Sequence, residues 1–149
     1  MSNTRRIQNG FTLLEIMIVV VILGILATMV LVNVGDKPDQ ARVVKAKQDI
    51  KSLESALNMY RLDNYNYPST DQGLEALVHK PSGSPEPKHW QKGGYIQHLP
   101  KDPWGHDYQY LNPGTHSTID IYSFGADGQP GGQGINADIG NWNLDEAGQ

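Results

Sequence analysis

One unbroken apolar stretch stands near the start of the chain, and apolar and polar positions are mixed everywhere else. Residues 16–32 carry no charge, and the 22 residues from Phe11 to Val32 carry a single charged side chain, Glu15. At 1.5 Å per residue, a helix of that length covers roughly 33 Å, which is enough to cross the hydrocarbon core of a bilayer. The pattern therefore predicts a membrane-spanning helix over residues 11–35.

Two other interpretations of this stretch are a cleaved secretory signal and a helix buried in a protein core. The stretch is longer than the roughly 7–15 apolar residues of a secretory signal, and no A-x-A-like cleavage site follows it. Membrane anchoring is therefore favoured. Charge leaves the orientation open, because Arg5 and Arg6 precede the stretch whereas more cations follow it: Lys37, Arg42, Lys45, Lys47 and Lys51.

A second helix is predicted by apolar residues that recur at spacings of three and four: Val43, Ala46, Ile50, Leu53, Leu57 and Tyr60. This spacing places one apolar stripe along a helix, as expected for a packing surface. Pro38 has no amide donor, so the helix should kink or loosen before it, or a fresh helix begins there with Asp36 as its cap. We expect one long interrupted helix over residues 11–61, whose second half packs on a soluble head.

The residues after position 64 are rich in glycine, proline and aromatic side chains, which indicates short elements and loops. Ser69 and Gln72 have the spacing of a capping box and predict a short helix through Leu77, followed by a loop over residues 80–88. Residues 108–111 and 118–124 alternate as strands do, with a turn between them. The predicted fold class is α+β, a long helix packed on a small antiparallel sheet.

Composition limits the possible functions. The chain has 149 residues, a formal net charge of −4 and no cysteine, so it is long enough for one domain and has no disulfide or thiol nucleophile. An acidic chain is a poor candidate for binding nucleic acid. No H-E-x-x-H, G-x-S-x-G or phosphate-loop motif is present, so we expect no enzyme, and the five histidines are expected at the surface: His79, His89, His98, His106 and His116.

The last third of the chain has a charge imbalance that would suit a cation. Residues 102–149 contain no lysine or arginine but seven acids: Asp102, Asp107, Asp120, Asp127, Asp138, Asp145 and Glu146. Glycines crowd the segment between Asp127 and Asp138, and tight glycine loops can turn carbonyl oxygens inward to join carboxylates around Ca²⁺. The spacing is not that of an EF-hand. From the residues alone, a calcium loop and a plain polar loop both remain open.

The start of the chain resembles the signal of type IV pilins and pseudopilins. A basic leader ends in Gly10, and the apolar run GFTLLEIMIVVVILGILA begins at once. The resemblance implies that a prepilin peptidase cuts between Gly10 and Phe11 on the cytoplasmic side and methylates the new amine of Phe11. It also implies that Glu15 pairs with the N-terminal amine of a neighbouring subunit. The alternative is that Glu15 reaches to the membrane interface, since an unpaired carboxylate in hydrocarbon is costly.

Blocks spread over nearly the whole chain resemble the major pseudopilin of the type II secretion system: residues 62–64, 67–70, 72–77, 94–96, 99–105 and 137–142. The resemblance implies a type IV pilin-like fold with a leader peptide at 1–10, a transmembrane and filament-core helix at 11–35 and a periplasmic head at 36–149. It further implies a homopolymeric filament that works with minor pseudopilins and an inner-membrane assembly platform to export folded proteins across the outer membrane.

The same resemblance implies a calcium site in the glycine-rich segment. Asp127, Asp138 and the backbone carbonyl of Phe124 fall on positions that bind calcium in that family. Ala137 stands where some members have a second aspartate, so Asn136 or the carbonyl of Gly134 is expected to complete the ligands.

Two further functions compete with a pseudopilin. One is a type IV pilus pilin for adhesion or motility. The absence of cysteine disfavours it, because such pilins commonly carry a disulfide in their C-terminal region. The other is an anchored carbohydrate-binding module, but its candidate side chains are more simply explained as packing residues of the head: Trp90, Trp104 and Trp142.

Overall fold

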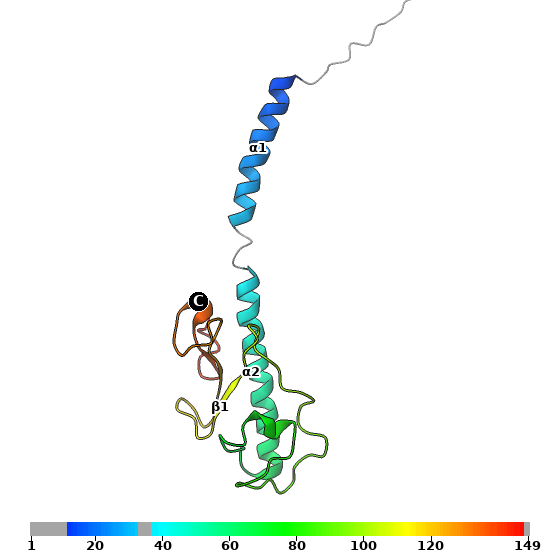
Figure 1. Ribbon diagram of the computed structural model, residues 1–149, viewed down its shortest axis with the longest axis vertical. Coiled ribbons are helices and arrows are strands. Elements are labelled where there is room, and N and C mark those ends of the chain that lie inside the picture. Colours follow the sequence, from blue (N-terminus) through cyan, green and yellow to red (C-terminus); the bar gives the residue numbers. More distant parts are fainter. Residues whose placement is uncertain (1–11, 33–36, 148–149) are drawn as a thin grey trace, which may run out of the picture. The chain divides into compact units, whose positions relative to one another are not determined.

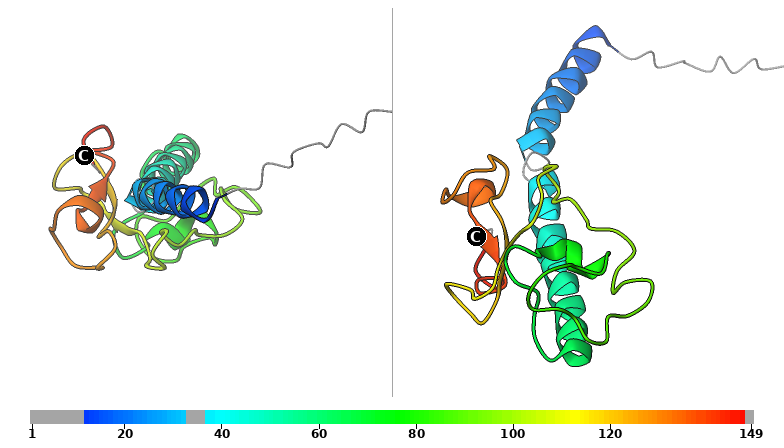
Figure 2. Two further views of the ribbon diagram at one scale, coloured as in Figure 1. Left: turned by 90° about the horizontal axis from the view of Figure 1, so that it is seen from above. Right: turned by 60° about the horizontal axis from the view of Figure 1, so that its bottom comes forward.

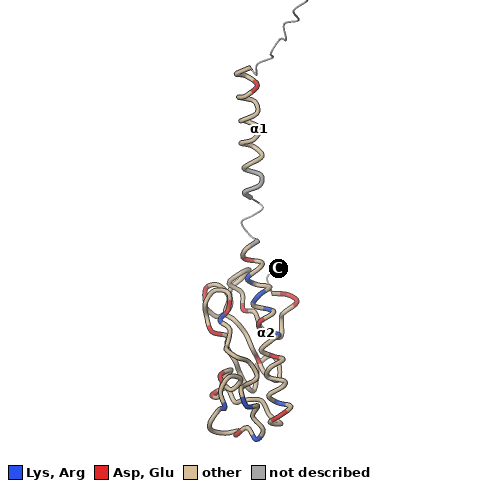
Figure 3. The backbone as a smooth tube through the Cα atoms, turned by 90° about the vertical axis from the view of Figure 1, so that its right-hand side faces the viewer, with Lys and Arg blue, Asp and Glu red and all other residues tan. Residues whose placement is uncertain are grey.

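The computed structural model describes residues 12–32 and 37–147 of the chain. It comprises two units, residues 1–38 and 39–149, which are considered separately. Charged positions are plentiful in the second unit and scarce along the helix of the first (Figure 3).

The first unit contains helix α1, Leu13–Val32. Thr12 starts it, because its hydroxyl accepts the Glu15 amide at 3.3 Å and its carbonyl accepts the Ile16 amide at 3.2 Å. The large apolar side chains from Leu13 to Leu26 are each at least 48% exposed. Among residues 12–32 and 37–147, no helix is both long and apolar enough to cross a membrane. The span predicted over residues 11–35 includes positions 11 and 33–35, which lie outside the described residues.

Helix α2, Lys37–Asn64, starts two residues before the boundary of the units, and the rest of it is the first element of the second unit. Pro38 occupies its first turn, where a missing amide donor costs nothing, so the alternative of a fresh helix fits better than a kink. The expected cap, Asp36, lies outside the described residues. The predicted apolar stripe is confirmed, because all of its members are at most 5% exposed: Val43, Ala46, Ile50, Leu53, Leu57 and Tyr60.

The chain after α2 folds back around the second half of that helix, and the C-terminal segment lies beside its first half (Figure 1, Figure 2). The capping box is present, since Ser69 Oγ accepts the Gln72 amide at 3.2 Å and Gln72 Oε1 accepts the Ser69 amide at 2.9 Å. A turn follows instead of an α-helix, and only a short 3₁₀ helix, η1, forms over Leu74–Leu77.

Three short strands form one antiparallel sheet in the order β1-β2-β3. They are β1 Gln109–Leu111, β2 Asp120–Ser123 and β3 Ile139–Gly140. The first two lie within the predicted strands, and the third was not predicted. Tyr110 faces Ile121 across the first pair, and Ser123 faces Ile139 across the second.

One hydrophobic core joins α2 to the sheet and to η1. The stripe of α2 packs with side chains from both, including Leu77, Ile121 and Ile139, which are at most 1% exposed. Two tyrosines fix this packing at its edges. The Tyr108 hydroxyl donates to Asp49 of α2 at 3.0 Å, and the Tyr110 hydroxyl donates to the Pro68 carbonyl at 2.9 Å. The α+β arrangement predicted from the sequence is therefore present.

Candidate functional site: the N-terminal helix and a glycine-rich loop

The predicted processing and assembly residues stand at the start of α1. Gly10 and Phe11 lie outside the described residues. Glu15 occupies the first turn of α1 and its side chain is exposed. An acid in this position interacts favourably with the positive end of the helix dipole. The carboxylate is thus available to a group from another chain.

The second candidate is the glycine-rich loop, residues 124–138, which connects β2 to β3. Its two ends are held next to each other, because Ser123 at the end of β2 pairs with Ile139 at the start of β3. Within it, residues Gly134–Asn136 form a short 3₁₀ turn, η2. The loop is therefore anchored by the sheet at both ends and is otherwise built from turns.

The base of the loop is closed by Gly125. The neighbouring Ala126 amide donates to the Ile135 carbonyl at 2.9 Å. Gly125 has a φ of 72°, and a Cβ on it would stand 2.7 Å from the Ile135 oxygen and 2.8 Å from the Ala137 oxygen. Only glycine fits this approach, which brings the carbonyl oxygens of Ile135 and Ala137 against the backbone of residue 125.

The two predicted carboxylate ligands have different environments. Asp127 is exposed, and its Oδ1 accepts the Gln129 amide at 3.1 Å. Asp138 is half-buried, and its Oδ2 accepts the Gly131 amide at 3.0 Å. Its other oxygen, Oδ1, is buried and has no hydrogen-bond partner among the described residues. A buried carboxylate oxygen without a partner is destabilising, so this atom fits a position for a cation.

Asp138 borders two cavities that contain other predicted ligands. One, of about 170 Å³, is also lined by Phe124, Tyr122 and Trp142, and the other, of about 420 Å³, by Gly134 and Ala137. Asn136 is half-buried beside Gly125. In the part of the chain that the structure describes, no group of three or more histidine or acidic side chains could hold a metal. A cation here would depend on backbone and amide oxygens around Asp138.

Two buried acids were not singled out from the sequence. Asp120 is fully buried, and its Oδ2 accepts the amides of Thr115 at 2.6 Å and His116 at 3.0 Å, while its Oδ1 accepts the Ser117 amide at 2.9 Å. Burial by itself would raise the pKa of Asp120, but the hydrogen bonds from these three residues outweigh it and hold the pKa well below its ordinary value. Asp120 therefore stays ionised and orders the turn before β2.

Asp102 is the other buried acid, and it bonds to Trp104, His106 and Ser123. The sequence did hold a signal for it, since aspartate before Pro-x-Gly is a common way to start a turn. No comparable local signal marks Asp120, whose partners precede it by three to five residues.

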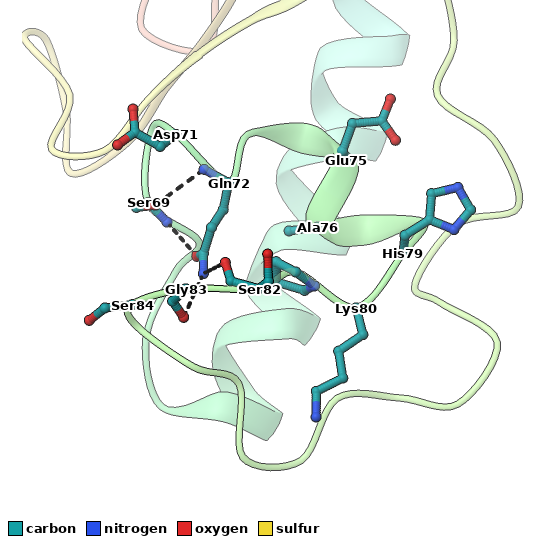
Figure 4. Close-up of a pocket in the computed structure, with 11 residues that line it drawn as sticks. Ser69, Asp71, Gln72, Glu75, Ala76, His79, Lys80, Ser82, Gly83 and Ser84 are labelled. Atoms are coloured by element: carbon teal, nitrogen blue, oxygen red, sulfur yellow. Dashed lines mark hydrogen bonds between the residues drawn. The ribbon is translucent and has the colours of Figure 1, made fainter.

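Another pocket, of about 420 Å³, is polar and lies beside η1 (Figure 4). Its drawn hydrogen bonds all belong to Gln72, which bonds to Ser69 and to carbonyls of the 82–83 segment. The side chains of Asp71, Glu75, His79 and Lys80 point in different directions (Figure 4). These bonds hold the 82–83 segment against the turn and do not bring the charged groups together.

The predictions for histidine and tryptophan are confirmed. All five histidines are exposed. Trp90 and Trp104 are partly buried against the core, and Trp142 stacks on His116 with ring centroids 3.9 Å apart.

Two family models match the chain in succession. The model described as "Prokaryotic N-terminal methylation motif" matches residues 5–31, and that described as "Type II secretion system (T2SS), protein G" matches residues 33–142. Together they cover the predicted processing region and nearly all of the head.

Relatives and a solved structure agree with these matches. The chain is 63% identical to type II secretion system core protein G of Pseudomonas aeruginosa, covering 93% of this chain and 97% of that protein. It is 61% identical to the protein of the same name from Vibrio cholerae, covering 95% and 96%. It also resembles the crystal structure of the major pseudopilin from the type 2 secretion system of enterohaemorrhagic Escherichia coli, with a TM-score of 0.66, 54% identity, and coverage of 74% of this chain and 94% of that one.

Proposed function

Because the chain belongs to the protein G family of the type II secretion system, we infer that it is a major pseudopilin, the subunit that polymerises into the pseudopilus. The observation that carries this inference is the order of the two family matches, a methylation motif followed at once by a protein G head. The fold is that of a pseudopilin. The function is thus assembly rather than catalysis, and growth of the filament drives folded proteins across the outer membrane. The names of the relatives disfavour the alternative of an adhesive or motile type IV pilus.

Processing and membrane insertion precede assembly in this proposal. Prepilin peptidase cuts between Gly10 and Phe11 and methylates the amine of Phe11, which is supported by the match of the methylation motif to residues 5–31. Residues 11–35 then anchor the chain in the inner membrane as a single span, with the head in the periplasm. The 22-residue apolar stretch supports this, since it has the length that a bilayer core requires.

Assembly uses α1. Its large apolar side chains from Leu13 to Leu26 are at least 48% exposed in the single chain, so they can be covered by lipid or by the same helix of other subunits. A repeated contact between unlike surfaces of identical subunits generates an open helical filament. Minor pseudopilins and the inner-membrane platform are the partners proposed for starting and driving this growth.

Substituting Glu15 tests the assembly step. Glu15→Leu removes the carboxylate proposed to pair with the Phe11 amine of the next subunit, and the helix becomes more apolar, so membrane insertion should persist while filaments disappear. Met17→Leu is the matched control on the same helix. Filaments seen by electron microscopy at normal abundance in cells expressing Glu15→Leu would contradict the pairing.

We also propose that the glycine-rich loop binds Ca²⁺. The ligands would be Asp138, Asp127, the carbonyls of Phe124 and Gly134, and the side chain of Asn136. The support is the buried, unpartnered Oδ1 of Asp138 together with the surplus of acids in residues 102–149. Bound calcium would neutralise the two carboxylates and tie the ends of the loop together, as a structural brace.

Calcium titration tests this site. Adding Ca²⁺ to the full chain in detergent should raise the melting temperature of the head, because a ligand that binds only the folded state stabilises it by mass action. Asp138→Asn should remove the rise, whereas Asp71→Asn, which deletes an exposed acid beside η1, should keep it. An unchanged melting temperature at millimolar Ca²⁺ would overturn the proposal.

A further inference from the structure

The carboxylate of Asp102 is not among the proposed calcium ligands, yet hydrogen bonds connect it to their loop. Its side chain is 0% exposed. Oδ1 accepts the Trp104 amide at 3.0 Å and the His106 amide at 2.8 Å. The turn is closed further by the Gly105 amide, which donates to the Asp102 carbonyl at 3.0 Å. One oxygen of Asp102 thus fixes the turn formed by residues 102–106.

The other oxygen faces the sheet. The hydroxyl of Ser123, at the end of β2, donates to Asp102 Oδ2 at 2.6 Å, and both groups are buried. The same hydroxyl oxygen accepts the Gly125 amide at 3.1 Å. A hydroxyl has one hydrogen and two lone pairs, so giving the hydrogen to Asp102 leaves a lone pair for Gly125. Asp102 therefore sets the orientation of the group that holds Gly125.

Gly125 is the residue on which the glycine-rich loop closes. It follows Phe124 directly, and it lies against the backbone of residues 135–137, which contains Asn136 and leads to Asp138. Three of the proposed calcium ligands, Phe124, Asn136 and Asp138, therefore belong to the two backbone segments that meet at Gly125. A shift of the Gly125 amide would move the two sides of the loop relative to each other.

A second contact joins the turn to the loop. A Cβ on Gly128 would stand 3.1 Å from Cε1 and Nε2 of His106, so the imidazole ring lies directly against the loop backbone. The turn formed by residues 102–106 thus supports the loop at two points, Gly125 through Ser123 and Gly128 through His106.

We propose that Asp102 is a positioning residue for the calcium site: through Ser123 it holds the base of the glycine-rich loop in the shape that binds the ion. The inference rests on the proposed calcium binding. Outer groups that orient ligands without touching the metal typically change affinity by about 10-fold to 100-fold.

Asp102→Asn is the main test, measured as the calcium dissociation constant of the full chain in detergent. The amide keeps an oxygen for Trp104 and His106 but places an NH₂ group against the Ser123 hydroxyl, which then has no acceptor. We expect about 10-fold or more weaker binding. Asp107→Asn is the matched control, because it deletes the same charge from a neighbouring position whose side chain is 74% exposed and pairs with Lys101.

Ser123→Ala is the second variant, and it keeps the test decisive if Asp102→Asn does not fold. It breaks the link to Gly125 while leaving the bonds inside the turn intact, so it should weaken calcium binding to a similar extent. The double variant should bind calcium no more weakly than the single variant with the lower calcium affinity, since both changes break the same connection between Asp102 and Gly125. Hydrogen exchange of the Gly125 amide without calcium should be faster in both single variants and unchanged in Asp107→Asn.

The outcomes separate the two proposals. If the unaltered chain binds no calcium, the calcium proposal is overturned and this inference with it. If the unaltered chain binds calcium, and folded Asp102→Asn and Ser123→Ala bind it equally well, the calcium proposal stands and the positioning role of Asp102 is overturned.

Discussion

Buried carboxylates that have no lysine or arginine partner, and only a histidine ring beside them, are the distinctive residues of the described part of the head. No lysine or arginine occurs in residues 102–149, so Asp102 and Asp120 are satisfied by amide and hydroxyl donors. Hydrogen bonds from backbone amides stabilise the ionised form of such groups. The acid surplus and Asp138 could be identified from the sequence, but the burial of Asp102 and Asp120 could not, because their hydrogen-bond donors are positioned only by turn formation or by the distant strand β2.

Asp120 should make stability fall in acid. Its folded-state pKa lies below the ordinary value of about 3.9, so its contribution to the free energy of unfolding is complete above that value and is lost as the pH falls toward the folded-state pKa. Asp120→Asn should destabilise the head at neutral pH by about 1–3 kcal/mol and make stability less dependent on pH below about 4. Urea unfolding at pH 7 and pH 3 measures both effects. Equal losses at the two pH values would contradict this role.

Gly125 should be less replaceable than another glycine of the same loop. Gly125→Ala incurs the left-handed backbone cost of about 1–2 kcal/mol and also a collision with the Ile135 and Ala137 oxygens. Gly131 has a φ of 89° with no atom near its missing Cβ, so Gly131→Ala incurs the backbone cost alone. Thermal unfolding should show the larger loss for Gly125→Ala, and equal losses would show that the close approach is unimportant.

At the scale of elements, the spacing of apolar residues predicted which side chains lie in the core. Long-range contacts determine where the helices and strands begin and end. The apolar stripe of α2 could be predicted because apolar residues spaced three and four apart lie on one face of an α-helix. The helix runs to Asn64, three residues beyond the predicted end, where the Asn64 side chain donates to the Tyr60 carbonyl and accepts the His89 amide. Strand β3 has only two residues and no alternation, so it exists through pairing with β2 and left no pattern to detect.

Leu57 tests the core face of α2. It is 0% exposed, so Leu57→Ala should destabilise the head by about 2–5 kcal/mol through lost burial and a cavity. Met59→Ala, two residues along the helix at a position that is 53% exposed, should change the free energy of unfolding by about 0.5 kcal/mol or less. Urea unfolding compares the two variants, and a similar cost for both would contradict the assignment of the faces.

At the scale of the whole molecule, two units serve two purposes. The head has its own core, sheet and glycine-rich loop, whereas α1 presents apolar side chains that other subunits or lipid can cover. The family could be inferred from the sequence because its motifs are local: a glycine before an apolar run, and the blocks at 99–105 and 137–142. The complete ligand set of the proposed calcium site could not be inferred in the same way, since it depends on which loop oxygens converge.

The central claim is that the chain is processed and assembled as a pseudopilin, and mass spectrometry of the N-terminus of the membrane-bound protein tests it most directly. We expect a mature chain that begins with N-methylated Phe11, with residues 1–10 removed and the apolar stretch retained. A chain that keeps Met1, or one cut after Val34 as a secretory signal would be, would contradict it.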